Sequence, residues 1–138
     1  MKICVVCMAN YCRSPVAEVL LNERGNINAI SAGISPIISS DMDPRSRLYL
    51  ESLGLNPKPH IPRPISNEIF NEYDLVLAAD TFVLMKLNSK FSKYINKIKM
   101  ISFQNPKLKL KDPFKLNEEE YLLVMDDIKT AVDSIKIE

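Results

Sequence analysis

The stretch VVCMANYCRSPVAEVLL, residues 5–21, joins two different sequence patterns. It completes an apolar run, KICVVC at 2–7, of the kind that forms a buried β-strand. From Ser14, a suitable helix cap, it continues with Pro15 in a first turn, apolar residues at helical spacing and a terminal glycine. We therefore predict a strand over 2–7, a short loop, and a helix over 14–25.

The rest of the chain alternates in the same way. Short apolar runs between turn residues predict strands at 28–33, 74–79 and 97–102. Helices are predicted at 43–54, which starts at an Asp-Pro pair, and at 117–137. Behind a capping pair, Asn117 and Glu120, the last helix has its apolar residues on one face: Tyr121, Met125, Ile128, Val132 and Ile135. This alternation predicts an α/β fold, a four-stranded parallel sheet with helices on both faces.

Composition is that of a small globular protein. The 138 residues are 46% hydrophobic and 25% charged, which predicts a single domain over 1–138 with a sizeable core. No window resembles a signal peptide or a membrane span. All three cysteines, Cys4, Cys7 and Cys12, lie too close together to staple a secreted fold. We expect a cytoplasmic protein without membrane insertion.

Charge is spread unevenly, although the net charge is only +1. Residues 81–111 hold eight lysines and no acid, whereas residues 112–138 hold eight acids and three lysines. The lysines are either a solvated surface or a local positive field that attracts anionic substrates. Because no known nucleic-acid motif accompanies them, a nucleic-acid partner is not expected.

The loop between Cys7 and Ser14 follows the first strand, where parallel α/β sheets bind ligands. Backbone N–H groups that point into such a loop bind an anion and favour the thiolate form of a cysteine at its base. Arg13 can hold two phosphoryl oxygens at once, and Ser14 can donate a hydrogen bond to the Cys7 sulfur. The loop therefore suits attack of Cys7 on a phosphate monoester, through a cysteinyl-phosphate intermediate.

The loop and its flanks resemble the signature of the low molecular weight protein tyrosine phosphatases, Cys-x-x-Asn-x-Cys-Arg-Ser-Pro. The resemblance continues over nearly the whole chain in five further motifs: SAG at 31–33, DPRS at 43–46, HIPRPI at 60–65, FNEYDLVLAAD at 70–80 and DPF at 112–114. It implies a hydrolase that needs no metal and no cofactor, removes phosphate from phosphotyrosine on proteins, and releases inorganic phosphate.

The resemblance also implies roles for individual residues. Cys7 is the nucleophile, Arg13 the phosphate clamp and Asp112 the general acid. The phosphate-binding residues are Met8, Ala9, Asn10, Tyr11, Cys12, Arg13 and Ser14. The hydrogen-bonded network that holds the loop in shape comprises Asn10, Ser14, Ser31 and His60.

Three positions depart from the family pattern. Ala9 stands where many relatives carry glycine, so its φ must be negative. Phe114 is followed by Lys115 where the family usually has a second aromatic residue, and Tyr11 replaces a common aliphatic residue. We therefore expect Tyr11 and Phe114 to form a thinner aromatic substrate wall than that of the relatives.

Two aspartates precede a proline, and each has a different expected role. Asp43 stands before a predicted helix, where an N-cap is the ordinary explanation. Asp112 lies between the fourth strand and the last helix, in a segment that returns to the edge of the sheet where the first loop lies. Asp112 is therefore the better candidate for the acid.

The remaining cysteines allow several interpretations. Cys4 and Cys7 form a C-x-x-C pair, but a structural zinc needs four ligands and the chain offers one further cysteine and one histidine. We expect Cys4 to pack in the core. Cys12 either packs under the loop or acts as a redox partner that traps oxidised Cys7 as a disulfide.

Two other functions stay open at this point. The same fold and loop support arsenate reduction in related proteins, although that chemistry uses cysteines later in the chain and none follows Cys12 here. The other alternative is a catalytically silent module that binds phosphate or phosphotyrosine.

Overall fold

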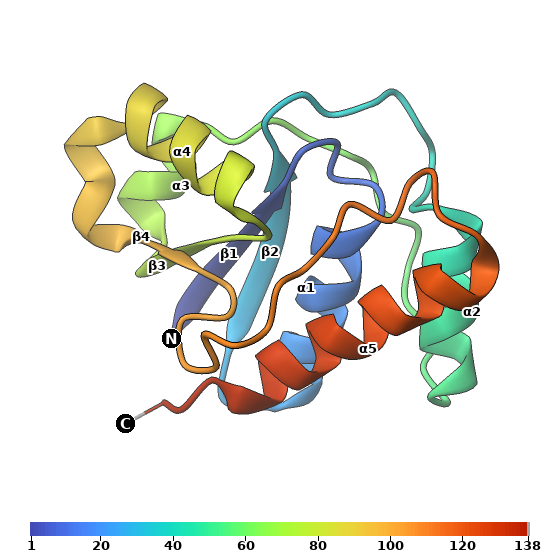
Figure 1. The fold of residues 1–138 in the computed structure, drawn as a ribbon. Helices are drawn as coiled ribbons and strands as arrows, with labels where there is room; N and C mark the ends of the chain where they lie inside the picture. Colours follow the sequence, from blue (N-terminus) through green and yellow to red (C-terminus); the bar gives the residue numbers. More distant parts are fainter. Residues whose placement is uncertain (138) are drawn as a thin grey trace.

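The computed structural model describes residues 1–137 and contains four parallel strands with helices on both sides (Figure 1). The strand order is β2-β1-β3-β4. The strands are β1 (Lys2–Cys7), β2 (Asn28–Gly33), β3 (Leu75–Ala78) and β4 (Ile98–Met100). The predicted four-stranded parallel α/β fold is confirmed, with β3 and β4 shorter than predicted.

The position of β1 decides where the loop after it lies. β1 is an inner strand that pairs with β2 on one side and with β3 on the other, so that Val5 stands beside both Ser31 and Leu77. Cys7 is the last residue of β1 and pairs with Gly33, the last residue of β2. The loop that starts at Cys7 therefore lies at the middle of the carboxyl edge, where such sheets bind ligands.

The first helix, α1 (Arg13–Glu23), begins one residue earlier than predicted, and its N-cap is Cys12 instead of Ser14. The physical reason is that the Ser14 hydroxyl is engaged by the side chains of Cys7 and Asn10. A hydroxyl held in this way does not serve a helix N–H group.

Two other predicted helices have the expected caps. α2 (Pro44–Ser52) follows Asp43, whose carboxylate accepts a hydrogen bond from the N–H of Arg45. α5 (Glu118–Ser134) starts with a reciprocal pair, because Asn117 accepts from the N–H of Glu120 and donates to its carboxylate. Both capping predictions are confirmed, and the predicted apolar face of α5 is buried.

Two α-helices and a short 3-10 helix were not predicted: α3 (Asn67–Glu72), α4 (Thr81–Lys90) and η1 (Ser92–Lys97). α3 is capped by Ser66 and α4 by Asp80. α3 has too few residues to show a periodic pattern. In α4 the exposed Phe82 and Met85 interrupt the pattern of a one-sided apolar face.

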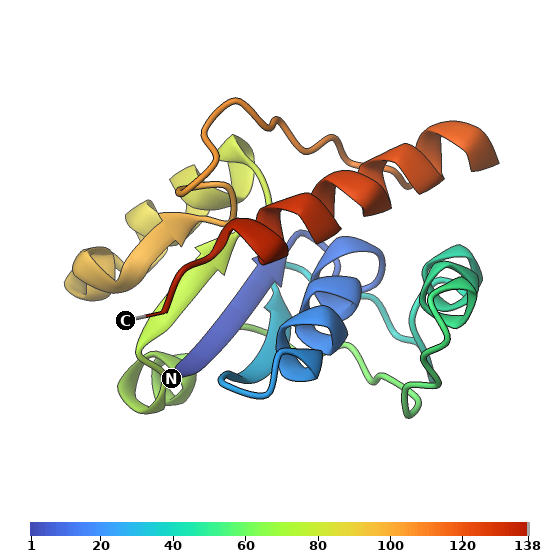
Figure 2. The ribbon, with the colours of Figure 1, turned by 90° about the horizontal axis from the view of Figure 1, so that it is seen from below.

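The sheet separates two apolar layers, and Figures 1 and 2 show the helices that lie on its opposite sides. α1 and α5 cover one face and pack on Ile3 and Val5, and α2 packs outside them, against α1 and α5. α3 and α4 cover the other face and pack on Cys4 and Val6, because successive side chains of a strand point to opposite faces. The prediction that Cys4 packs in the core is confirmed. Among the described residues, no helix has the length and apolar character to cross a membrane.

Candidate active site

The backbone of the loop after β1 is held from outside. All six carbonyl groups from Cys7 to Cys12 accept hydrogen bonds from residues outside the loop, four of them from backbone N–H groups of the segment 34–43. None of the N–H groups from Met8 to Cys12 donates a hydrogen bond within residues 1–137. With the carbonyls engaged outward, a ring of free donors is left for an anion.

The loop side chains form a chain of hydrogen bonds beneath this ring. The Asn10 amide nitrogen donates to Ser14 Oγ at 2.8 Å and to Ser31 Oγ at 3.0 Å. Ser31 donates in turn to Glu18 at 2.7 Å. Ser14 Oγ lies 3.0 Å from Cys7 Sγ. Because Ser14 already accepts from Asn10, its own proton is free to be donated to the Cys7 sulfur.

Asn10 combines an unusual backbone conformation with several hydrogen bonds that hold the loop. Its φ is 53°, the only positive φ of a non-glycine residue among those described. Ala9 therefore has a negative φ, as predicted. Asparagine tolerates this left-handed conformation better than most side chains. Its Oδ1 accepts from the N–H of Arg63 at 3.0 Å, and its carbonyl oxygen lies 3.1 Å from His60 Nε2. His60 therefore lies in the supporting network, and its burial lowers the pKa of the imidazole.

Gly33, at the end of β2, limits the space beneath the loop. A Cβ on Gly33 would lie 3.0 Å from Asn10 Cβ and 3.0 Å from the Met8 carbonyl oxygen. Gly33 also pairs with the extended segment that contains Pro64. The loop therefore rests directly on the sheet and on the segment after His60.

Arg13 is buried and is held by a residue that the sequence reasoning missed. Its Nη1 donates to Asp80 Oδ2 at 2.8 Å, while Asp80 Oδ1 accepts from the N–H of Val83 and caps α4. Asp80 follows the end of β3 by two residues, at the same edge of the sheet as Cys7. An acid placed just after a buried strand was the signal that could have found it.

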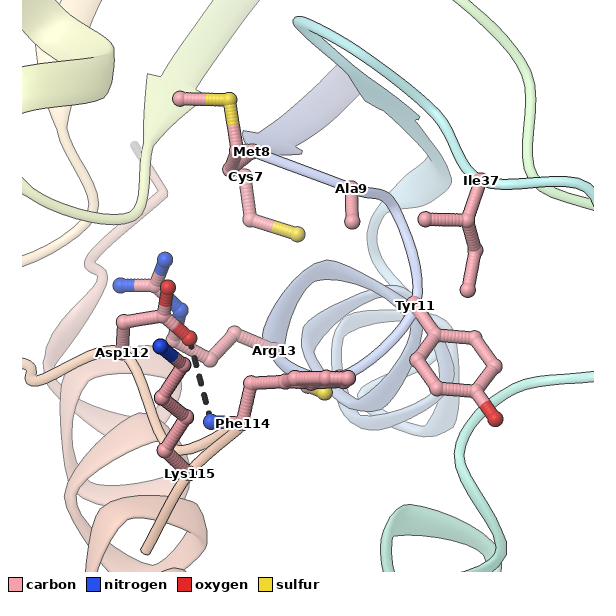
Figure 3. A pocket seen from close by; sticks show the side chains of 10 residues that line it. Cys7, Met8, Ala9, Tyr11, Arg13, Ile37, Asp112, Phe114 and Lys115 are labelled. Carbon is pink, nitrogen blue, oxygen red and sulfur yellow. Dashed lines mark hydrogen bonds between the residues drawn. The ribbon is translucent and has the colours of Figure 1, made fainter.

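A cavity of about 420 Å³ opens above the loop (Figure 3). The Cys7 sulfur points into it, and Arg13 and Asp112 both line it, on the same side of the view. Tyr11 and Phe114 line it with ring centroids 6.5 Å apart. The rest of the lining is Met8, Ala9, Cys12, Ile37 and Lys115. Ile37 was not expected, and no sequence signal marked it.

Two of the residues predicted to surround the phosphate do not line this cavity. Asn10 and Ser14 have buried side chains that face the supporting network. A bound anion can meet these positions only through the backbone.

Asp112 lies in an exposed segment with few restraints. Its Oδ1 accepts from the N–H of Phe114 at 3.2 Å. Arg45 of α2 donates to the carbonyl oxygens of Phe114 and Leu116, each at 3.1 Å. Arg45 also binds Asp43, so one arginine connects the cap of α2 to the segment that carries Asp112.

Cys12 faces the helical layer below the loop. Its thiol donates to Asp43 Oδ2 at 3.7 Å, and its carbonyl oxygen accepts from Ser46. Burial raises the pKa of the Cys12 thiol to about 12. Cys12 is thus held as a neutral thiol at physiological pH.

The chain is similar to known proteins both in sequence and in structure. The model of a family described as low molecular weight phosphotyrosine protein phosphatase matches residues 2–136. The chain is 40% identical over 77 residues to the low molecular weight protein-tyrosine-phosphatase Ptp of Acinetobacter johnsonii, a match over 55% of this chain and 54% of that protein. It is 32% identical over 105 residues to a protein-arginine-phosphatase of Bacillus subtilis, covering 71% and 68% of the two chains. The low molecular weight protein tyrosine phosphatase of T. tengcongensis has the same fold, with a TM-score of 0.89, 26% identity, and 97% and 96% of the two chains covered.

Proposed function

The chain belongs to the low molecular weight phosphotyrosine protein phosphatase family, and on this premise we propose that it hydrolyses phosphotyrosine on proteins with Cys7, Arg13 and Asp112. One observation carries the proposal. The Cys7 sulfur points into a cavity that is also lined by Arg13 and Asp112, at the base of a loop whose N–H groups are free.

The first step forms a covalent intermediate. The loop N–H groups and Arg13 hold the phosphoryl oxygens, and their positive charge stabilises the transition state. The Cys7 thiolate attacks phosphorus, the bond between phosphorus and the tyrosyl oxygen breaks, and Asp112 gives its proton to that oxygen. The products are tyrosine and a cysteinyl-phosphate.

The second step releases phosphate. Asp112, now ionised, takes a proton from a water molecule as the water oxygen attacks phosphorus. The bond between sulfur and phosphorus breaks, and the hydrogen bond from Ser14, at 3.0 Å, stabilises the departing Cys7 thiolate. Inorganic phosphate leaves and the enzyme is restored, without a metal ion.

The walls of the cavity favour an aromatic phosphate ester. Tyr11 and Phe114 offer two aromatic rings that can flank a phenyl group. Lys115 at the same cavity disfavours the cationic guanidinium of phosphoarginine, the substrate class named for the Bacillus subtilis relative. We therefore place phosphotyrosine before phosphoarginine.

The two alternatives raised by the sequence have less support. Arsenate reduction lacks its later cysteines, because none follows Cys12. A silent binding module would not need an acid beside the nucleophile, yet Asp112 lines the cavity into which Cys7 points. Hydrolysis uses every one of these groups.

A steady-state assay tests the proposal. The purified protein should hydrolyse p-nitrophenyl phosphate and phosphotyrosine, and act more slowly on phosphoserine, phosphoarginine and, with a thiol reductant, arsenate. Faster turnover of phosphoarginine than of phosphotyrosine would contradict the substrate assignment. Absence of any phosphatase activity would contradict the proposed function itself.

The proposal also covers the domain organisation, localisation and partners of the enzyme. We place one domain, residues 1–138, in the cytoplasm, with a phosphoprotein as substrate and no nucleic-acid partner. Cys12 remains a candidate redox partner of Cys7, which a search for a Cys7–Cys12 disulfide after peroxide treatment would test.

A further inference from the structure

A second cavity lies on the far side of Asp80 from the catalytic loop. It measures about 800 Å³ and is bounded by α4, β4 and the segment 102–110, and we call it the lysine groove. Leu84, Met100, Phe103 and Leu108 contribute to its apolar walls. It is larger than the cavity above the loop, and no step of the proposed reaction uses it.

The lysine groove carries net positive charge, because the one acid in its lining, Asp80, is paired with Arg13. Lys99 and Lys109 line it, and within residues 1–137 neither ammonium group forms an ion pair or a hydrogen bond. Lys99 Nζ lies 5.7 Å from the centroid of the Phe103 ring. The surrounding sequence, residues 81–111, contains eight lysines and no acid. Six of the eight acids of residues 112–138 lie on α5, and none of these six lines the groove. The groove therefore suits an anionic ligand with an apolar portion.

The lysine groove and the catalytic cavity share a wall. Asp80 lines the groove and binds Arg13 at 2.8 Å, and Arg13 lines the catalytic cavity. The chain that follows also serves both, because Leu110 lines the groove and Asp112 lines the catalytic cavity. A peptide whose phosphorylated residue sits over Cys7 needs to pass only this wall to reach the groove.

We propose that the lysine groove is a docking site for an acidic segment of the phosphoprotein substrate. This inference rests on the proposed function, because the phosphorylated residue must first be held at the catalytic loop. Once it is held, the neighbouring acids reach Lys99 and Lys109 at a high effective concentration, so weak ion pairs are sufficient for selection.

The length of the groove limits where these acids lie in the substrate. Its wall on α4 runs from Asp80 to Asn88, about 12 Å at the rise of a helix. An extended peptide covers about 3.3 Å per residue, so the groove accommodates roughly four residues. With the wall to be passed first, the acids should lie about three to six positions from the phosphotyrosine.

Matched peptides test this proposal. Two phosphotyrosine peptides carry glutamates three to six positions away, one on the N-terminal and one on the C-terminal side, and each has a partner with glutamines instead. For at least one pair, the wild type should show a higher kcat/KM on the acidic peptide. The double variant Lys99→Glu and Lys109→Glu should lower that preference about three- to tenfold, since exposed ion pairs are individually weak. Its activity on p-nitrophenyl phosphate, which is too small to reach the groove, should be unchanged.

Controls separate this site from general charge. The double variant Lys58→Glu and Lys136→Glu changes the net charge equally at exposed lysines that do not line the groove, and should keep the preference. In the wild type the preference should shrink as the salt concentration rises from about 0.01 M to about 0.15 M.

Three outcomes would overturn the docking site. The first is an equal kcat/KM of the wild type on each acidic peptide and its glutamine partner. The second is an equal loss of the acidic-peptide preference in the two double variants. The third is sedimentation of the wild type with vesicles of anionic lipid that the Lys99→Glu and Lys109→Glu variant no longer shows. The last result would assign the surface to a membrane. All three presume normal turnover of p-nitrophenyl phosphate, whose absence would instead contradict the proposed function.

Discussion

The loop after β1 and the segment that carries Asp112 contribute to the same cavity, but they are held very differently. From Cys7 to Cys12 every carbonyl oxygen of the loop is hydrogen-bonded, and the Asn10 side chain contacts three separate parts of the chain. Asp112 and Phe114 are exposed and depend on one local hydrogen bond and on Arg45. The structure thus combines a proposed anion site with many hydrogen bonds and a proposed acid with few.

Stability and substrate specificity therefore depend on different parts of the site. The phosphate is common to every substrate, so its site can be built in advance and buried. The leaving group differs between substrates, and the groups that meet it lie on a segment that can change at little cost to the fold. Changes at the buried loop residues Asn10, Arg13 and Ser14 should therefore affect both folding and rate, whereas changes in the Asp112 segment should affect rate alone.

The strongest test of the anion site is Cys7→Ser. Turnover should fall by roughly 10³-fold or more, because the thiolate that forms the covalent bond is lost. Phosphate or vanadate should still bind, since the loop N–H groups and Arg13 remain, and calorimetry would measure this. If the variant kept about a tenth of the wild-type kcat, the proposed nucleophile would be wrong.

The exposed side is tested by Asp112→Asn. We expect kcat on aryl phosphates with poor leaving groups to fall roughly 10²- to 10⁴-fold, because the leaving oxygen no longer receives a proton. The free energy of unfolding should change by less than about 0.5 kcal/mol, as is usual for an exposed side chain. Asp43→Asn is the control with the opposite expectation, a loss of stability at the cap of α2. If Asp43 were the general acid, Asp43→Asn would lose kcat and Asp112→Asn would keep it.

Asn10→Ala should reduce both stability and rate. The variant loses three hydrogen bonds of a buried amide and retains a Cβ at positive φ, which should lower the free energy of unfolding by about 2–4 kcal/mol. Asn10→Gly removes the same bonds but tolerates the φ, so it separates the two contributions. Chemical denaturation and kcat on p-nitrophenyl phosphate measure the effect. An Asn10→Ala variant with wild-type stability would show that the loop is not held by this amide.

The smallest effect concerns Asp41. It lies in the segment 34–43, whose backbone N–H groups donate hydrogen bonds to the loop carbonyls. Hydrogen bonds from Arg47 lower the pKa of the Asp41 carboxyl well below its usual range. A lowered pKa in the folded state means that Asp41 contributes stability above its unfolded pKa, roughly 4, and that this contribution is lost as the pH falls below that value. Asp41→Asn should therefore lower Tm by a few degrees at pH 7, and its deficit should shrink below about pH 4. Thermal melts across pH measure this, and a deficit that grew in acid would contradict the sign.

Local features of the fold could be predicted from the sequence because neighbours along the chain decide them. The caps by Asp43 and Asn117 depend only on the next few residues, and the loop signature occupies one continuous stretch. The N-cap at Ser14 was wrong because the hydroxyl has a stronger use in the tertiary structure, beside Cys7. Local sequence does not report that competition.

The parts of the site that were missed depend on the order of the strands. Asp80 holds Arg13 across 67 positions of sequence, and this contact exists because β3 pairs with β1. Arg45 reaches the segment around Phe114 only because α2 and α5 pack side by side. Likewise, nothing in the run of lysines at 81–111 indicated that two of them line a cavity next to Asp80.

Gly33 limits how the loop above it can vary. Since even a methyl group there would lie 3.0 Å from both Asn10 and Met8, the loop has no clearance above the sheet. The width of the ring of N–H groups is then set by the end of β2 and not by the exposed side chains of the loop. Substitutions at Met8, Ala9 or Tyr11 can alter what surrounds the anion, whereas the size of the anion itself stays constant. Substitutions around the ring can therefore change which phosphate ester binds, while the ring itself continues to fit a group of the size of a phosphoryl.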